Sequence, residues 1–110
     1  MGKMQRDKGK EGEREVARIL RAHGYADAHR TAQVRGDTGE AADVIGLPGF
    51  HLEVKRQEVL KIEEWWRQAV HDSTFTGDIP VLVFRKNRQD WRVCMDFETF
   101  LEVIKDYVPF

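Results

Sequence analysis

The chain contains a single cysteine, Cys94, among its 110 residues. One thiol cannot form an internal disulfide, and this usage is typical of proteins in a reducing compartment. The sequence also lacks a signal peptide, and it has no apolar run near the roughly 18 residues that cross a bilayer. We therefore expect a cytoplasmic protein without a membrane span.

Net charge is also small, at −1, so the chain as a whole gives no sign of nucleic-acid binding. The distribution is uneven, because residues 1–36 hold nine Lys and Arg against five Asp and Glu, and residues 37–110 hold nine against fourteen. The basic N-terminal third is a candidate phosphate-facing surface, although a solvated helix face would give the same pattern. Repeats are absent, and 41% apolar with 34% charged residues is typical of a globular domain.

Hydrophobic periodicity divides the chain into eight elements. We expect a flexible N-terminus over residues 1–8 and a single domain over residues 9–110. Within the domain the pattern predicts helices at 10–23, at 61–73 and from Phe97 onward with Asp96 as N-cap, and strands at 25–32, 41–47, 50–56, 79–85 and 91–95. The order α-β-β-β-α-β-β-α predicts an α/β fold, with a mixed five-stranded sheet flanked by helices.

One predicted strand carries a charged triplet, Glu53-Val54-Lys55. Alternate strand residues share a face, so Glu53 and Lys55 are expected side by side, with His51 on the same face and able to touch them. The acid-x-lysine spacing occurs once in the chain, about as often as chance would supply it in a chain this acidic. The triplet alone therefore carries no information about function.

Asp43 gives the triplet a context. It enters an apolar strand ten positions before Glu53, and the turn at 47–49 would bring the two strands together. Two carboxylates that close repel, and a divalent cation such as Mg²⁺ or Mn²⁺ removes the penalty. A cation there, with Lys55 beside it, would activate water and neutralise a scissile phosphate. The pattern Asp-x9-Glu-x-Lys therefore indicates a phosphodiester hydrolysis site, to which the Val54 carbonyl adds a ligand.

On a predicted β-hairpin, Asp43 and Glu53-Val54-Lys55 resemble the motif of the PD-(D/E)XK nuclease superfamily. The stretch KGKEGEREVARILRAHGYADAHR, residues 8–30, is similar to the first helix and strand of archaeal-type Holliday junction resolvases. The resemblance covers residues 8–56 and implies a restriction-endonuclease-like core.

The chain departs from the resolvase pattern at three places. The loop at 31–36 replaces a Ser-Gly-rich segment, and Ala42 rather than proline precedes Asp43. The helix at 61–73 carries WWRQA, closer to phage-type nucleases of the superfamily, in which a glutamine, here Gln68, supports the site. These departures bear on junction specificity more than on nuclease chemistry.

The resemblance also implies a set of site residues. The catalytic set is Glu13, Asp43, Glu53, Lys55 and Gln68, and the metal ligands are Glu13, Asp43, Glu53 and the Val54 carbonyl. The metal is expected to be Mg²⁺, for which Mn²⁺ can substitute, with Lys55 positioning the nucleophile. On the sequence alone, Glu11 and Glu15 are equally good choices to Glu13, because a helix dipole favours any first-turn acid.

The candidate phosphate contacts are Lys8, Lys10, Arg14, Arg30 and Arg35. Symmetric cleavage of a four-way DNA junction needs two related active sites, so a resolvase-like function implies a C2 homodimer. Residues 107–110 and one of the tryptophans Trp65 and Trp66 are candidate interface pieces.

We therefore expect a Mg²⁺-dependent, structure-selective DNA endonuclease that resolves Holliday junctions in a prokaryotic, archaeal or phage-infected cell. Two alternatives stay open: another nuclease of the superfamily that acts on flap or duplex DNA, and a non-catalytic DNA-binding module on the same scaffold. The intact acids and lysine argue against the second. An unrelated small α/β protein would place the carboxylates of Asp43 and Glu53 far apart.

Overall fold

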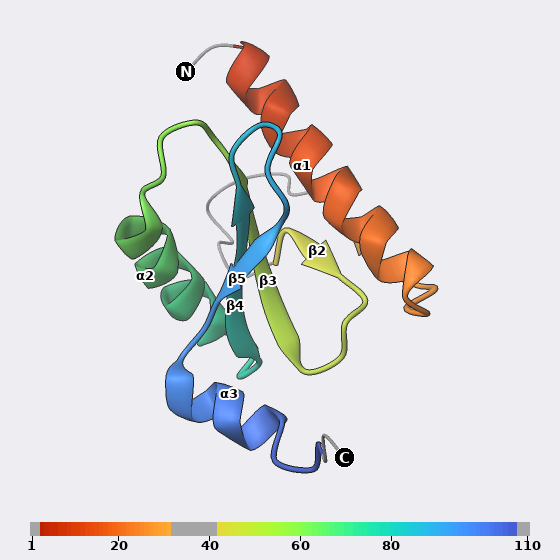
Figure 1. The fold of residues 1–110 in the computed structure, drawn as a ribbon, viewed down its shortest axis with the longest axis vertical. Helices are drawn as coiled ribbons and strands as arrows, with labels where there is room; N and C mark the ends of the chain where they lie inside the picture. The colour runs from red at the N-terminus through yellow and green to blue at the C-terminus, as the bar shows by residue number, and fades with distance from the viewer. Residues whose placement is uncertain (1–2, 32–41, 108–110) are drawn as a thin grey trace.

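The computed structural model describes residues 3–31 and 42–107 (Figure 1). Within these residues the elements are α1 (Lys3–Ala22), β1 (His29–Arg30), β2 (Val44–Ile45), β3 (Phe50–Arg56), α2 (Ile62–Ser73), β4 (Ile79–Arg85), β5 (Arg92–Cys94) and α3 (Phe97–Val103). Their order confirms the α/β arrangement expected from the periodicity. No helix of the described residues is long and apolar enough to cross a membrane.

The five strands form one mixed sheet in the order β1-β2-β3-β4-β5. β3 and β4 are parallel and joined by the crossover through α2, and every other neighbouring pair is antiparallel. The predicted bounds of these two central strands, 50–56 and 79–85, are confirmed at both ends. Both strands are buried over most of their length, so their apolar runs mark the bounds clearly.

The sheet carries a helix on each face (Figure 1), and each face has its own core. The core beneath α1 consists of Val16, Ala17, Val44, Leu52, Val54, Val81 and Val83. The core beneath α2 consists of Trp65, Leu82 and Phe84. Because side chains alternate along β3, its polar residues His51, Glu53 and Lys55 all fall on the α2 face. That face is therefore polar along β3 and apolar along β4.

The three strands outside the central pair are shorter than the sequence predicts. β1 covers two residues of the expected 25–32, β2 two residues of the expected 41–47, and β5 three of the expected 91–95. β2 ends at Gly46, where φ is +113° and an added Cβ would lie 2.4 Å from the Cα of Ala28. Only glycine fits this turn, so the strand ends where the two chain segments cross.

α1 begins at Lys3 rather than near residue 10. Residues 3–8 are mostly good helix formers, so propensity carries the helix beyond its apolar stripe. The expected flexibility of residues 1–8 stays a prediction. α3 begins as expected after Asp96, whose carboxylate accepts a hydrogen bond from the Thr99 amide at 3.1 Å.

Candidate active site

A cleft of about 710 Å³ lies between α1, β3 and α2. Among the residues that line it are the predicted catalytic set and the predicted backbone ligand, which are Glu13, Asp43, Glu53, Val54, Lys55 and Gln68. These come from four segments separated along the chain: α1, the start of the hairpin, β3 and α2. The fold thus brings together every residue of the predicted catalytic set.

Asp43 is held against β3 by backbone hydrogen bonds. Its amide donates to the Leu52 carbonyl at 2.9 Å, and its Oδ2 accepts from the Val54 amide at 2.8 Å. The carboxylates of Asp43 and Glu53 both lie in buried positions, at 9% and 3% exposure of their residues. The hairpin therefore places two buried acids next to each other, as the sequence predicted.

The electrostatics of this pair favour a bound cation. Burial, and then the charge of Glu53, raises the pKa of Asp43 to about 7. Burial likewise raises the pKa of Glu13, even though Arg30 acts in the opposite direction. Carboxylates that are desolvated and mutually repelling are destabilised as anions until a cation neutralises them. The donor set, which consists of carboxylate oxygens, fits a hard divalent cation.

Glu53 lies between the side chains of His51 and Lys55 on the same face of β3. Its Oε1 is 3.7 Å from Nε2 of His51, and its Oε2 is 3.9 Å from Nζ of Lys55. The Lys55 side chain keeps 23% of its surface exposed. The ammonium group is therefore close to the acids and also open to the cleft.

Glu13 faces the cleft but is already paired. Nε of Arg30 donates to Glu13 Oε1 at 2.9 Å. Among the described residues, Glu13, Asp43 and Glu53 do not form a group whose ligand atoms all lie within 4.8 Å of one another. The three acids converge on one cleft rather than on one point, and direct ligation by Glu13 stays a prediction.

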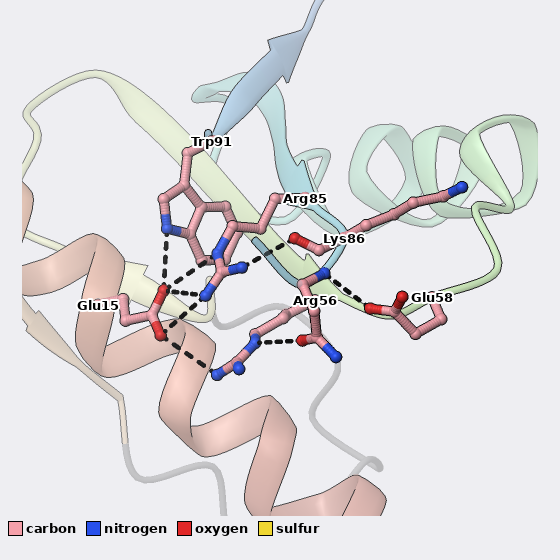
Figure 2. Close-up of polar contacts among 7 residues, drawn as sticks. Glu15, Arg56, Glu58, Arg85, Lys86 and Trp91 are labelled. Carbon is pink, nitrogen blue, oxygen red and sulfur yellow. Dashed lines mark hydrogen bonds and ion pairs between the residues drawn. The ribbon is translucent and has the colours of Figure 1, made fainter. Parts of the chain in front are cut away.

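Glu15, which the sequence could not separate from Glu13, has a different environment (Figure 2). It accepts hydrogen bonds from Arg56 at 3.2 Å, from Arg85 at 2.9 Å and from the indole of Trp91 at 3.1 Å. The guanidinium of Arg85 also lies over the Trp91 ring, at 5.2 Å from its centroid. Glu15 therefore ties α1 to β3 and β4 outside the cleft. Glu11 is exposed and does not line the cleft either.

The structure adds Asp72 of α2, which the sequence did not single out. His51, Glu53 and Asp72 offer ligand atoms that all lie within 4.8 Å of one another. Asp72 follows Gln68 by four residues, so both lie on the same side of α2 as the buried Trp65. That spacing is the signal which could have found it.

The predicted phosphate contacts fall in different places. Lys8 lines the cleft, and Lys10 is exposed on α1 outside it. Arg14 and Arg30 line a neighbouring hollow of about 270 Å³, together with Arg18 and Arg21, which the sequence did not single out. Arg35 lies outside the described residues.

The predicted interface pieces are also placed in part. Trp65 of α2 is buried against the sheet, and Trp66 is half-buried against the same core, so Trp66 leaves more of its surface to a partner. Tyr107 is exposed, and residues 108–110 lie outside the described residues.

A mixed sheet covered on both faces, with buried acids and a lysine where the β2–β3 hairpin meets α1, defines the PD-(D/E)XK class of nucleases. Over residues 4–109 the chain matches the family described as "Phage putative PDDEXK endonuclease", and it belongs to that family. The predicted nuclease family is thereby confirmed.

A solved structure supports the same fold. The chain is similar to Hjc of Archaeoglobus fulgidus, described as a Holliday junction resolvase from an archaeal hyperthermophile, with 22% sequence identity and a TM-score of 0.58. The match covers 80% of this chain and 72% of that one. No curated protein matches the chain. The restriction-endonuclease-like fold expected from the sequence is confirmed.

Proposed function

We propose that this protein is a divalent-metal-dependent DNA endonuclease that cuts branched DNA, with the four-way junction as its preferred substrate. The observation that carries the proposal is the meeting of Asp43, Glu53 and Lys55 in one cleft. The preference for junctions rests on the similarity of the fold to Hjc, which is described as a Holliday junction resolvase.

Asp43, Glu53 and the Val54 carbonyl are the proposed holders of Mg²⁺, or of Mn²⁺ in its place, with Glu13 on the facing wall of the cleft. A divalent cation in such a site lowers the pKa of a bound water and neutralises charge on the scissile phosphate. The hydrogen bond from the Val54 amide fixes Asp43 Oδ2 before any ligand arrives. This arrangement reduces the cost of ordering the carboxylate.

Lys55 is the proposed positioning group for the attacking water. Its ammonium lies 3.9 Å from Glu53 Oε2, within reach of a water held by the acids. A fixed positive charge at that place also stabilises the negative charge that develops on the phosphate oxygens. Gln68 of α2 lines the same cleft and is the proposed second hydrogen-bonding partner for substrate or water.

Basic residues extend from the cleft along α1 and beneath it. Lys8 and Lys61 line the cleft itself. The adjoining hollow is lined by the basic residues Arg14, Arg18, Arg21 and Arg30, and by His29. Each phosphate neutralised adds about −0.9 to the dependence of log K on log salt for duplex DNA. This stripe is therefore the proposed path of a DNA backbone.

A second copy of the chain is the proposed protein partner. α3 lies beyond the end of the sheet (Figure 1). It has no buried residue, and Phe97, Phe100 and Leu101 are exposed on it. An apolar groove of about 350 Å³, lined by residues of α1 and the sheet, includes the exposed Val93 of β5, directly before α3. We expect α3 of each copy to cover this groove on the other. Phe100→Glu should then give a monomer in sedimentation equilibrium, and a wild-type monomer would contradict the dimer.

Cleavage and binding should be measured in parallel on a labelled four-way junction, a flap and a plain duplex at fixed salt. With Mg²⁺, we expect wild type to cut the junction at least about tenfold faster than the duplex, a preference of about 1.4 kcal/mol. Lys55→Ala should lose at least about 100-fold in cleavage rate and keep its junction affinity. Lys86→Ala, which removes a lysine outside the cleft, is the matched control and should behave as wild type.

Three results would contradict the proposal. Equal cutting of flap or duplex would identify another nuclease of the superfamily. Junction binding without cutting by wild type, with either Mg²⁺ or Mn²⁺, would identify a non-catalytic module. Full activity of Lys55→Ala would remove the assigned role of the lysine.

A further inference from the structure

The side chain of His51 is in an unusual position for a histidine. It is 1% exposed in the central strand β3, and its Nε2 has no hydrogen-bond partner among the described residues. Nearly all buried polar groups in folded proteins have a partner, so an unpartnered one indicates a missing water or ion. The environment of Nε2 therefore decides what it binds.

Two carboxylates face this nitrogen. Glu53 Oε1 lies 3.7 Å away on the same strand, and Asp72 reaches it from α2. Ligand atoms of all three residues lie within 4.8 Å of one another. Both supporting elements are firmly packed, because β3 is central in the sheet and α2 is anchored by the buried Trp65 and Ala69. The three side chains therefore have little freedom to move apart.

The charges around Asp72 are not balanced within the protein. Burial and then the charge of Glu53 raise the pKa of Asp72, while His51, His71 and a hydrogen bond with Gln68 act in the opposite direction. The carboxylates of Asp72 and Glu53 therefore repel each other beside the buried imidazole of His51. A cation between them would satisfy both acids and the orphaned nitrogen.

The donor set differs from that of the cleft. Imidazole nitrogen and carboxylate oxygen are both ligands of Zn²⁺, which can take three protein ligands and keep its fourth position for water. Bonds of about 2.0–2.1 Å in a tetrahedral site put neighbouring ligand atoms about 3.4 Å apart, close to the observed separation of His51 and Glu53. Imidazole also favours ions such as Zn²⁺ over Mg²⁺, which prefers oxygen.

We propose that His51 Nε2, Glu53 Oε1 and the Asp72 carboxylate form a second metal site, selective for Zn²⁺ and similar ions. It goes beyond the proposed nuclease function and holds whether or not the protein cuts junctions, because it depends on the three donors alone. Glu53 directs Oε1 to this site and Oε2 toward Lys55, so the second site and the cleft share one carboxylate. Binding at one is therefore coupled to binding at the other.

Calorimetric titration of the chelator-stripped protein with Zn²⁺ alone, and separately with Mg²⁺ alone, tests the site. We expect one Zn²⁺ per chain in wild type and at least about tenfold weaker Zn²⁺ binding in Asp72→Asn and His51→Gln. Zn²⁺ should raise the Tm of wild type but not that of Asp72→Asn. Because Asp72 is partly exposed, its variant is expected to fold even if the His51 variant does not.

Two further variants locate the ion. Asp43→Asn should lose Mg²⁺ binding and keep Zn²⁺ binding, since Asp43 belongs to the cleft alone. His71→Gln, which removes an exposed histidine next to Asp72, should bind Zn²⁺ as wild type does. The proposal is overturned if wild type binds no stoichiometric Zn²⁺, which would leave a buried water as the partner of His51. It is also overturned if Asp72→Asn binds Zn²⁺ normally, or if Asp43→Asn and Asp72→Asn lose it equally.

Discussion

Glu13 and Glu15 of α1 are two residues apart but lie in different regions: Glu13 lines the cleft, and Glu15 lies outside it. The two regions differ in how their negative charge is paired. At Glu15, two arginines and an indole donate to one carboxylate (Figure 2). In the cleft, Asp43 and Glu53 are both buried, and Nζ of Lys55 lies 3.9 Å from Glu53 Oε2.

The number of acids is not what distinguishes these regions. Arg56 and Arg85 pair with the carboxylate of Glu15, and these ion pairs hold α1 to the sheet. In the cleft, Asp43 and Glu53 are buried and repel each other, and the pKa of Asp43 rises to about 7 as a result of burial and of the charge of Glu53. Buried acids whose pKa is raised by desolvation and by each other are typical of a functional site. Substitutions in the two regions should therefore have opposite effects on activity and stability.

The largest expected effect is on catalysis. Glu53→Gln should reduce metal-dependent cleavage by more than about 100-fold, because a shared ligand of the cleft is lost. With a chelator present and no metal bound, the free energy of unfolding of the variant should be no lower than that of wild type, because the substitution removes the repulsion between Glu53 and Asp43. Single-turnover cleavage and urea denaturation measure the two quantities. A large loss of stability would mean that Glu53 is structural, like Glu15.

The next effect is a pH dependence of stability in the metal-free protein. The folded-state pKa of Asp43, about 7, is above its ordinary value of 3.8. The folded chain therefore holds a proton that the unfolded chain releases, so stability present below about pH 4 is lost as pH rises to about 7. The slope from this group is at most about 1.4 kcal/mol per pH unit.

Urea denaturation in chelator at several pH values measures that slope. Asp43→Asn should remove it, and Glu15→Gln should leave it in place. Saturating Mg²⁺ should flatten the wild-type profile, because the cation binds the ionised carboxylate. A profile that is the same in wild type and Asp43→Asn would show that Asp43 does not titrate in this range.

The smallest expected effect is on stability alone. Glu15→Gln should lower the free energy of unfolding by about 1–3 kcal/mol, because the two arginines and the indole lose their charged acceptor. Cleavage per folded molecule should stay within about threefold of wild type, a difference of under 1 kcal/mol in barrier. Glu11→Gln, at an exposed position of the same helix, is the control and should change neither. A selective loss of cleavage in Glu15→Gln would mean that Glu15 also contributes to catalysis.

The sequence predicted the centre of the fold better than its edges. β3, β4 and α2 could be read from the chain, because buried apolar runs and a helical stripe have clear ends. β1 and β2 could not, since their length is set by the crossing at Gly46 and Ala28, a contact between distant segments. α1 exceeded its stripe because propensity alone extends it.

The candidate site shows the same division. Asp43, Glu53 and Lys55 could be brought together from the sequence, because a hairpin turn fixes which strand positions face each other. The spacing from Gln68 places Asp72 on the same side of α2, but its approach to His51 and Glu53 depends on how α2 packs over the sheet, which the sequence does not give. The same holds for Glu15, which the sequence could not distinguish from Glu13 until the positions of Arg56 and Arg85 were known.

The side chain and the backbone of Val54 have different roles. Its side chain is buried in the core beneath α1, whereas its amide donates to Asp43 on the edge of the cleft. The side chain therefore contributes only to the packing of the core, and any apolar residue of similar volume can replace it. The backbone amide holds Asp43 at the site, and no substitution except proline removes this donor. The middle position of the triplet can consequently drift in sequence while the geometry of the cleft stays constant.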